Sequence, residues 1–384
     1  MRYPRHALFG SLSFALLLAA CLASPAAAAH GPSHRSGADL GPAGWSAPVR
    51  VGGGIYSALS EVVDSHRHVD IAASKLGNVY FMTDRSGSWT ESLVMRHLPN
   101  RGYREVAIAL DANDRVYIAA RRSSCDDCVP GGSEGIFLIT DKGRAPGTFA
   151  SKPAMIAPSG AGEPSLKVNG GHVFLAYDSP CCMPGPDAAI YLRTNASGHW
   201  TQSRVARHGV SPVLRIGSDG RPRVAFSRQL GITYAVAHSI TGTFTLWNVP
   251  GTTHKDGDVA LTLDAHDQPH LAWMHFNPGD SDGGSVDVFA TRRTSAGWRA
   301  AEHVGPVHGT TNAIALDLDS LGRERIAVGG AQVMSYVRSG GQWIGTTVAQ
   351  GTAIHQVSIR RAANGRAVIA YTDFGGGVWV STDG

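Results

Sequence analysis

The sequence has few charged residues, few cysteines and, after its first residues, no long apolar run. Charged residues make up 17% of the 384 residues, and the net charge of +4 forms no basic stripe, which argues against a nucleic-acid partner. No later stretch is apolar enough to span a bilayer. Apolar residues also do not recur with the spacing of an amphipathic helix. The sequence therefore predicts neither a nucleic-acid binder, nor a membrane-spanning protein, nor a helical fold.

The N-terminus has the pattern of an export signal. Arg2 and Arg5 precede an almost wholly apolar run, Leu8–Ala20, and the small residues Ala27–Ala29 follow it. This order is typical of a signal peptide, here residues 1–29, cleaved before His30. Removing two arginines from 34 basic residues leaves 32 against 30 acidic ones, a mature net charge of +2. We expect a secreted or periplasmic protein.

The same segment carries an alternative processing signal. Leu18-Ala19-Ala20-Cys21 resembles a bacterial lipobox, which would place a lipid anchor on Cys21. Both interpretations export the chain, and both leave residues 30–42, rich in Gly, Ser and Pro, as a flexible lead-in. Residues 43–384 then form the folded part.

Glycine, by contrast, is abundant, with 47 residues in the chain. Short runs of Val, Ile, Leu, Ala, Tyr and Phe alternate with Gly, Asp, Asn and Ser, which is the pattern of strands and turns. In one segment the four expected strands are Ala260–Leu263, His270–Met274, Val286–Thr291 and Trp298–His303. The composition therefore predicts an all-β fold with many tight turns.

Two markers repeat seven times in matching phase. The first is an aromatic residue one or two positions after a glycine: Trp45, Trp89, Phe149, Trp200, Phe244, Trp298 and Trp343. The second is a basic residue between a polar turn and an apolar strand: His68, Arg115, His172, Arg223, His270, Arg325 and Arg366. Their spacing is close to that of β-propeller blades. We predict a seven-bladed β-propeller of four-stranded blades.

The phase of the markers also predicts how the ring closes. The first aromatic marker comes before the first basic marker, so Trp45–Val51 is a fourth strand without a blade. The last repeat ends shortly after Val378–Val380 and lacks its fourth strand. Pairing the two completes the last blade and removes an open sheet edge.

The repeat resembles that of the BNR or sialidase-like propellers. The segment from Ala189 to Trp200, with its aromatic-apolar strand and Gly-x-Trp turn, is a good example. The Asp-box of that superfamily is degenerate in every blade, although Ser381-Thr382-Asp383-Gly384 resembles its beginning. The Arg-Ile-Pro motif of sialidases is absent, so no sialidase catalytic residue is transferred to this chain.

Long second-to-third-strand loops place all the cysteines of the mature chain on one face. Cys125 and Cys128 belong to the second blade, and Cys181 and Cys182 to the third. In an exported protein we expect disulfides, with three pairings open. A thiolate metal site is the alternative, although adjacent cysteines are awkward ligands for one ion, and a redox-active pair is the third interpretation.

The fifth blade has an acidic, glycine-rich loop on the same face. Asp280, Asp282 and Asp287 alternate along it, and carboxylate oxygens in such a turn are ligands for calcium. The spacing is not that of an EF-hand. The alternative is a solvated loop with no ion.

Histidines recur in the connectors between blades, which reach the mouth of the central channel. They are His97, His208, His254, His308 and His355. Close to the same face in sequence lie Arg104, Arg207, Glu163 and Tyr177. Histidine clusters bind transition metals or transfer protons near neutral pH. His68, His172 and His270 belong to the repeat marker and are expected to be structural.

Three functions follow from this pattern. The first is a ligand-binding or interaction propeller with a glycan or protein ligand. The second is a carbohydrate-active enzyme, a glycoside hydrolase or a polysaccharide lyase, in which Arg neutralises a uronate and His or Tyr moves the proton. The third is a metal-dependent enzyme using the connector histidines. A propeller fold hosts many unrelated activities and does not choose among them.

Overall fold

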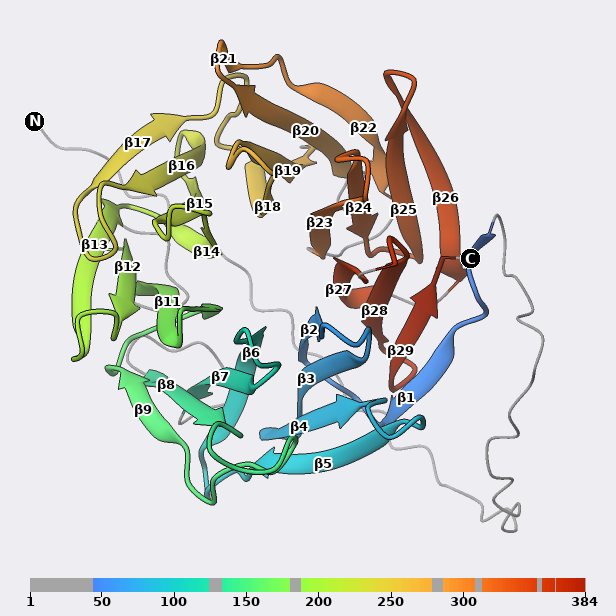
Figure 1. Cartoon of the computed structure of the whole chain (residues 1–384). Coiled ribbons are helices and arrows are strands. Elements are labelled where there is room, and N and C mark those ends of the chain that lie inside the picture. Colours follow the sequence, from blue (N-terminus) through green and yellow to red (C-terminus); the bar gives the residue numbers. More distant parts are fainter. Residues whose placement is uncertain are drawn as a thin grey trace, which may run out of the picture. The chain divides into compact units, whose positions relative to one another are not determined.

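Seven antiparallel sheets form a closed ring in the computed structural model (Figure 1). The structure describes residues 44–123, 133–179, 188–277, 286–307, 313–350, 354–362 and 364–383. Every helix or strand assigned within these ranges is a strand. The predicted seven-bladed β-propeller is therefore confirmed.

In the first four blades the chain runs from the centre of the ring to its rim. Their strands are β2 (Ala58–Val63), β3 (Val69–Lys75), β4 (Asn78–Thr83) and β5 (Thr90–Met95); β6 (Gly102–Leu110), β7 (Val116–Ser123), β8 (Ser133–Thr140) and β9 (Ala154–Ala157); β10 (Ser165–Asn169), β11 (His172–Ser179), β12 (Ala189–Thr194) and β13 (Thr201–Arg207); and β14 (Val210–Ile216), β15 (Pro222–Arg228), β16 (Gly231–Ala237) and β17 (Phe244–Asn248).

The last three blades follow the same plan, with one extra short strand in blade 5. Their strands are β18 (Asp256–Leu263), β19 (Pro269–Phe276), β20 (Val286–Thr294), β21 (Gly297–Trp298) and β22 (Glu302–Val307); β23 (Ile314–Leu318), β24 (Glu324–Val328), β25 (Gln332–Ser339) and β26 (Gln342–Gln350); and β27 (Ile354–Arg361), β28 (Ala367–Asp373), β29 (Gly377–Thr382) and β1 (Val49–Gly53). The rim strand β22 begins at Glu302, because Trp298 belongs to the short pair that β21 makes with β20.

Within a blade, the polar turn between the third and fourth strands is hydrogen-bonded to the start of the second strand. A side-chain oxygen of the outer turn accepts a hydrogen bond from the first amide of the second strand. These bonds run from Val69 to Asp84, from Val116 to Asp141 and from Val173 to Asn195, each 2.8 Å long. The carboxylate or amide thereby satisfies a backbone donor that the ladder leaves free. This is why the degenerate Asp-box keeps an Asp or Asn.

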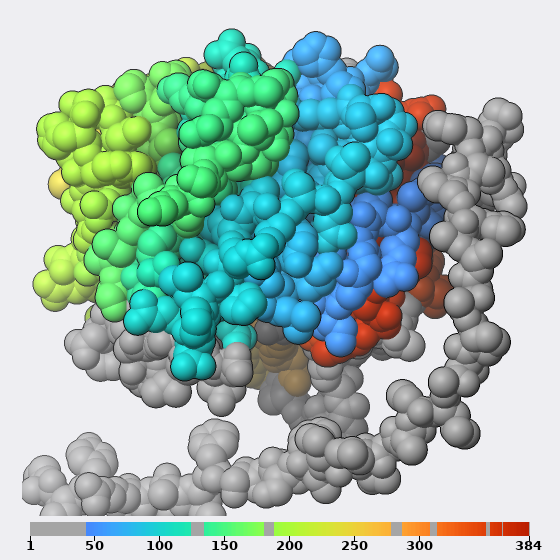
Figure 2. Space-filling model, turned by 90° about the horizontal axis from the view of Figure 1, so that it is seen from below, coloured from blue at the N-terminus to red at the C-terminus, as the bar shows by residue number. Residues whose placement is uncertain are grey.

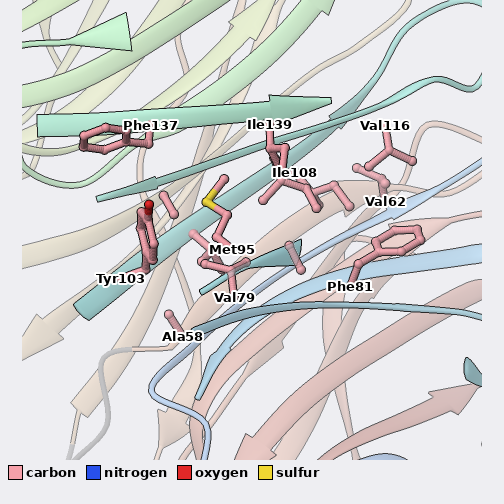
Figure 3. Close-up of a cluster of buried hydrophobic side chains, with 14 residues drawn as sticks. Ala58, Val62, Val79, Phe81, Met95, Tyr103, Ile108, Val116, Phe137 and Ile139 are labelled. Carbon is pink, nitrogen blue, oxygen red and sulfur yellow. The ribbon is translucent and has the colours of Figure 1, made fainter. Parts of the chain in front are cut away.

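The aromatic marker of each blade packs against the core that this blade shares with the preceding one. Figure 3 shows side chains of the core between blades 1 and 2, among them Phe81, Met95, Tyr103 and Phe137. Phe149, the marker of blade 2, meets Phe81 edge-on with ring centroids 5.2 Å apart. Neighbouring blades lie side by side around the rim (Figure 2). Each marker therefore stabilises the contact between two neighbouring blades.

The ring closes as predicted, through the N-terminal strand. β1 pairs antiparallel with β29, so that Val49 faces Val380. Trp45 precedes the regular strand, bridges to Asp383 and is only 4% exposed in the core between blades 6 and 7. The Ser46 amide donates to the Thr382 carbonyl at 2.8 Å. Both ends of the propeller chain are therefore held in one blade.

Within the described part of the chain, no helix has the length and apolar character needed to cross a membrane. The predicted signal peptide, the lead-in and Cys21 lie outside the described residues.

Candidate functional site

The alternation of strands gives the propeller two distinct faces. The connectors between blades and the loops between second and third strands open on one face, which we call the connector face. The turns between first and second strands, and between third and fourth strands, open on the other, the turn face. Loops on a rigid scaffold are where binding sites usually lie.

A cavity of about 470 Å³ opens on the connector face between blades 4 and 5. We call it the blade 4–5 pocket. It contains two of the predicted connector histidines, His208 and His254, although the two residues are 46 positions apart. Its lining residues are Ala188, His208, Gly209, Val210, Ser227, Arg228, Gln229, His254, Lys255, Asp256, Gly257 and Phe276.

One wall of this pocket is held in an uncommon backbone conformation. His208 has a φ of 57°, in the left-handed region that residues other than glycine rarely adopt. Its amide donates to the Ala188 carbonyl at 2.5 Å, and its carbonyl accepts from Nε of Arg228 at 3.1 Å. Because the guanidinium has five N–H donors, this bond leaves most of them for a ligand. The cation and the histidine are thus fixed together.

The pocket also holds a hydroxyl without a partner. Ser227 is 8% exposed, and among the described residues none forms a hydrogen bond with its Oγ. A buried hydroxyl left unpaired costs free energy that a bound ligand recovers. Opposite the Arg228 side, Lys255 and Phe276 are half-buried and His254 is exposed. The pocket therefore combines two cations, an aromatic ring and polar groups.

A buried carboxylate organises the blade 5 wall. Asp256 is 6% exposed and accepts from Trp273 Nε1 at 3.1 Å, from His275 Nδ1 at 2.8 Å and from the amide of Thr253. The bond to Nδ1 fixes the ring of His275 and leaves its Nε2 on the other side. His275 lies in the second strand, not in a connector, so the connector pattern missed it. Its alternation with Trp273 along β19 was the available signal.

Further out on blade 5, Asp287 is engaged with its neighbours. Its Oδ1 pairs with Nε2 of His303 at 2.9 Å, and its Oδ2 accepts from the Asn277 amide nitrogen at 2.9 Å. Burial alone would raise the pKa of Asp287, but these two bonds and the histidine charge lower it below its ordinary value. Asp280 and Asp282, the other carboxylates predicted to bind calcium, lie outside the described residues.

Acidic residues gather where the connector face meets the central channel. Burial raises the pKa of Glu163 to about 7, and the nearby charges of Asp178 and Glu105 raise it further. Asp178 is 4% exposed, and its Oδ1 accepts the Glu163 amide at 2.9 Å. Burial also raises the pKa values of Asp178 and Asp258 to about 6. Glu163 is exposed to solvent and is therefore within reach of a ligand.

The acidic group adjoins the blade 4–5 pocket along the chain. Ser211, which hydrogen-bonds Glu163, follows the pocket residue Val210. Asp258 follows the pocket residue Gly257. Ser211 and Asp258 both have positive φ, 53° and 44°. Two inner strands therefore carry the pocket and the acidic group in succession.

The remaining connector residues are not brought to this pocket. His97 and Arg104 line a separate cavity of about 670 Å³ between blades 1 and 2, where His97 Nδ1 lies 3.0 Å from Asn78 Oδ1. The ring of His355 contacts the ring of Phe374 at a tilt of 58°, and burial lowers the pKa of His355. Arg207 ends the rim strand of blade 3 and is exposed. His308 lies outside the described residues, as do Cys125, Cys128, Cys181 and Cys182.

Tyr177 was placed wrongly at the mouth. It is 1% exposed in the core between blades 2 and 3, stacked on Tyr191, and its hydroxyl donates to Gln202 Oε1 at 2.8 Å. Burial raises its pKa to about 12. The residue lies in β11, where alternation turns its ring toward blade 2. Proximity to a loop in sequence did not reveal that direction.

A histidine–carboxylate group on the turn face belongs to the repeat. Ligand atoms of Asp64, His66 and His68 lie within 4.8 Å of one another. Asp64 Oδ1 accepts the amides of both histidines, and its Oδ2 pairs with His68 Nδ1 at 2.8 Å. Asp319 and Arg323 make the equivalent pair in blade 6. His68 is therefore a turn-stabilising residue.

Comparisons with known proteins identify the fold. No protein-family model matches the chain, and no curated protein matches it. An ulvan lyase bound to -[GlcA(1-4)Rha3S]- is similar in structure, with 10% identity over 86% of this chain and 94% of that one, and a TM-score of 0.61. An α-L-arabinofuranosidase from Fusarium graminearum has 10% identity, coverages of 87% and 96%, and a TM-score of 0.50. A sialidase from Streptococcus pneumoniae has 10% identity, coverages of 86% and 68%, and a TM-score of 0.48.

Identities near 10% show a shared fold and nothing more of these proteins' chemistry. At that level the neighbours with TM-scores of 0.50 and 0.61 support the predicted resemblance in fold. The structural neighbours reported above are carbohydrate-active proteins, and a ligand-binding propeller is compatible with all of them. The choice of ligand has to come from the site itself.

Proposed function

We propose that the protein binds an acidic polysaccharide on its connector face, in the blade 4–5 pocket. The observation that carries this proposal is the composition of that pocket: Arg228 and Lys255 beside His208, His254 and the ring of Phe276. A guanidinium recognises carboxylate or sulfate oxygens with two parallel hydrogen bonds. An aromatic ring supplies an apolar face for a sugar, and the unpaired Ser227 hydroxyl supplies a further polar contact.

Two further points support an acidic glycan. The pocket adjoins the channel mouth, so a chain lying across the face would contact several connectors. The ulvan lyase with the same fold is itself bound to a ligand that contains GlcA. An exported location, as the N-terminal sequence indicates, would give the protein access to extracellular polysaccharide.

The test compares uronate polymers with neutral ones. Affinity electrophoresis and calorimetry should show binding to polygalacturonate or alginate and not to dextran, weakening as salt rises. Arg228→Met together with Lys255→Met should abolish the binding. Arg366→Met, an exposed arginine on the turn face, serves as the matched control and should bind like wild type. Equal binding by the double variant and the control would refute the proposal.

Cleavage of the bound glycan is the second candidate, favoured by Glu163. Its pKa of about 7 suits a proton donor or acceptor, and it lies next to the strands that carry the pocket. Lyase action would release an unsaturated uronate that absorbs in the ultraviolet, whereas hydrolysis would release only reducing ends. Glu163→Gln should remove either signal without removing binding. Binding with neither signal in wild type leaves the protein a binder.

A further inference from the structure

A second polar cavity lies on the axis of the ring. It has a volume of about 240 Å³ and is lined by residues of the seven innermost strands, β2, β6, β10, β14, β18, β23 and β27. Most of its walls are apolar or small, such as Leu166, Leu261 and Ala315. Three cationic side chains also line it: Lys167, Arg215 and Arg360.

The three cations occupy equivalent places in the repeat. Each follows a buried aliphatic residue, Leu166, Leu214 or Ile359, in the innermost strand of its blade. Blades 3, 4 and 7 therefore direct a positive charge into the channel at a similar level. Asp317 has the same place in blade 6.

Protein groups neutralise these charges only in part: the charge of Asp317 favours the charged forms of Lys167 and Arg215 but forms no ion pair with either. Arg215 and Arg360 each donate to the carbonyl of the preceding residue, Leu214 at 3.0 Å and Ile359 at 2.7 Å. Across the described part of the chain, no carboxylate forms an ion pair with the three cations, and no acceptor contacts the Lys167 ammonium. Asp317 uses its two oxygens for the amides of Leu318 and Arg361, both at 2.9 Å.

Glu61 does not supply a counter-charge for the three cations either. It is fully buried, and neither carboxyl oxygen has a hydrogen-bond partner among the described residues. Burial raises its pKa to about 8, which outweighs the attraction of Arg360, so it is largely uncharged at neutral pH. The channel therefore keeps an excess of positive charge.

The cations also destabilise one another. Burial lowers the pKa of Lys167 well below its ordinary range, and the charges of Arg215 and Arg360 lower it further. Burial lowers the pKa of Arg215 to about 9, with Arg360 adding to the effect. Confined like charges without a counter-charge are unfavourable in a protein interior.

We propose that the central channel binds a small inorganic anion, an oxyanion or a halide, between Lys167, Arg215 and Arg360. Among the described residues only Asp317 attracts Lys167 and Arg215, against three positive charges, so the anion supplies the remaining counter-charge and accepts charge-assisted hydrogen bonds from the ammonium and the two guanidinium groups. These donors come from three separate blades, so one ion ties blades 3, 4 and 7 together across the axis. The site is distinct from the blade 4–5 pocket and does not depend on the proposed glycan ligand.

The experiment measures thermal unfolding of the mature chain at constant ionic strength, with gluconate replaced stepwise by phosphate, sulfate or chloride. We expect the melting temperature to rise saturably with at least one of these small anions. Lys167→Met should weaken the binding of that anion by about tenfold or more, because the substitution removes a charged hydrogen-bond donor. Arg366→Met is the control of equal charge and should respond like wild type.

The sign of the effect separates an anion site from a structural lysine. In gluconate, Lys167→Met should melt above wild type, since it relieves the repulsion; in saturating anion it should melt below. No saturable rise in wild type, or the same rise in Lys167→Met, would overturn the proposal. If Lys167→Met does not fold, anomalous diffraction from a bromide-soaked wild-type crystal is the alternative test. We expect an anomalous peak between the three cations. The absence of a peak there would overturn the proposal.

Discussion

On the turn face, Asp319 is satisfied by its own hairpin, whereas burial raises the pKa of Asp84. Asp319 accepts the amides of Leu321 and Arg323 at 2.9 Å and the Arg323 guanidinium at 2.6 Å, and these bonds outweigh burial and lower its pKa. On the connector face the same residue type is left in less favourable surroundings. Burial raises the pKa values of Glu163 and Asp258, and the nearby Ser227 hydroxyl has no partner among the described residues.

The difference shows how the two faces are used. Asp-capped turns between the first and second strands recur in blades 1, 2, 5 and 6, at Asp64, Asp111, Asp264 and Asp319, and they hold the scaffold. On the connector face the Ser227 hydroxyl has no partner among the described residues, and positive φ occurs at His208, Ser211 and Asp258. Positive φ also occurs on the turn face, at Arg67, Asp114 and Asp267, so backbone strain does not by itself distinguish the two faces.

The largest change in stability should come from the scaffold. Trp45→Ala empties a buried site in the core that closes the ring, and should lower the free energy of unfolding by about 4 kcal/mol. Chemical denaturation measures this. Val49→Ala, at a half-exposed position of the adjoining strand, is the control and should cost less than about 0.5 kcal/mol. Similar losses in both would mean that closure does not depend on this core.

A single turn-face carboxylate should have the next largest effect. Asp141 is fully buried and accepts the amides of Val116 and Gly147, both at 2.8 Å. Asp141→Ala leaves two donors unpaired and should cost about 3 kcal/mol. Lys142→Ala, its exposed neighbour, should be nearly neutral. Hydrogen exchange should also speed up at Val116, and unchanged exchange there would contradict the assignment.

Two carboxylates, Glu163 on the connector face and Glu324 on the turn face, should respond to pH with opposite sign. Glu163 has a folded pKa of about 7 against an ordinary 4.5, so the folded state binds more protons and stability falls as pH rises through that window. Glu163→Gln should flatten this fall. Glu324 on the turn face has a lowered pKa, because its hydrogen bond with His270 outweighs the effect of burial. Its contribution to the free energy of unfolding is therefore lost as pH falls below 4.5. Denaturation between pH 3 and 8 tests both, and a steeper fall in Glu163→Gln would reverse the assignment.

The smallest effect on stability should accompany a clear effect on binding. His254 on the connector face and His266 on the turn face are both exposed. Replacing either by Gln should change the free energy of unfolding by less than about 0.5 kcal/mol. Only His254→Gln should weaken uronate binding. Equal uronate binding by both variants would show that His254 does not contact the proposed ligand.

The sequence by itself determined the blade number, the strand-and-turn plan and the closing strand. These follow from local rules, because period-2 patterns and turn residues act over a few positions and the repeat multiplies them. The aromatic marker was readable for the same reason, since each copy packs on the preceding blade. Only the fourth strand of blade 5 was misplaced, where Trp298 forms a separate short pair.

The tertiary structure alone decided which functional residues meet. Five connector histidines looked equivalent in sequence, but connectors are spread around a ring, and among the four that the structure describes only His208 and His254 share a pocket. Tyr177 was near a loop in sequence, yet strand alternation turned it into the core. Lys167, Arg215 and Arg360 are far apart along the chain, and ring closure alone brings their charges to one axis.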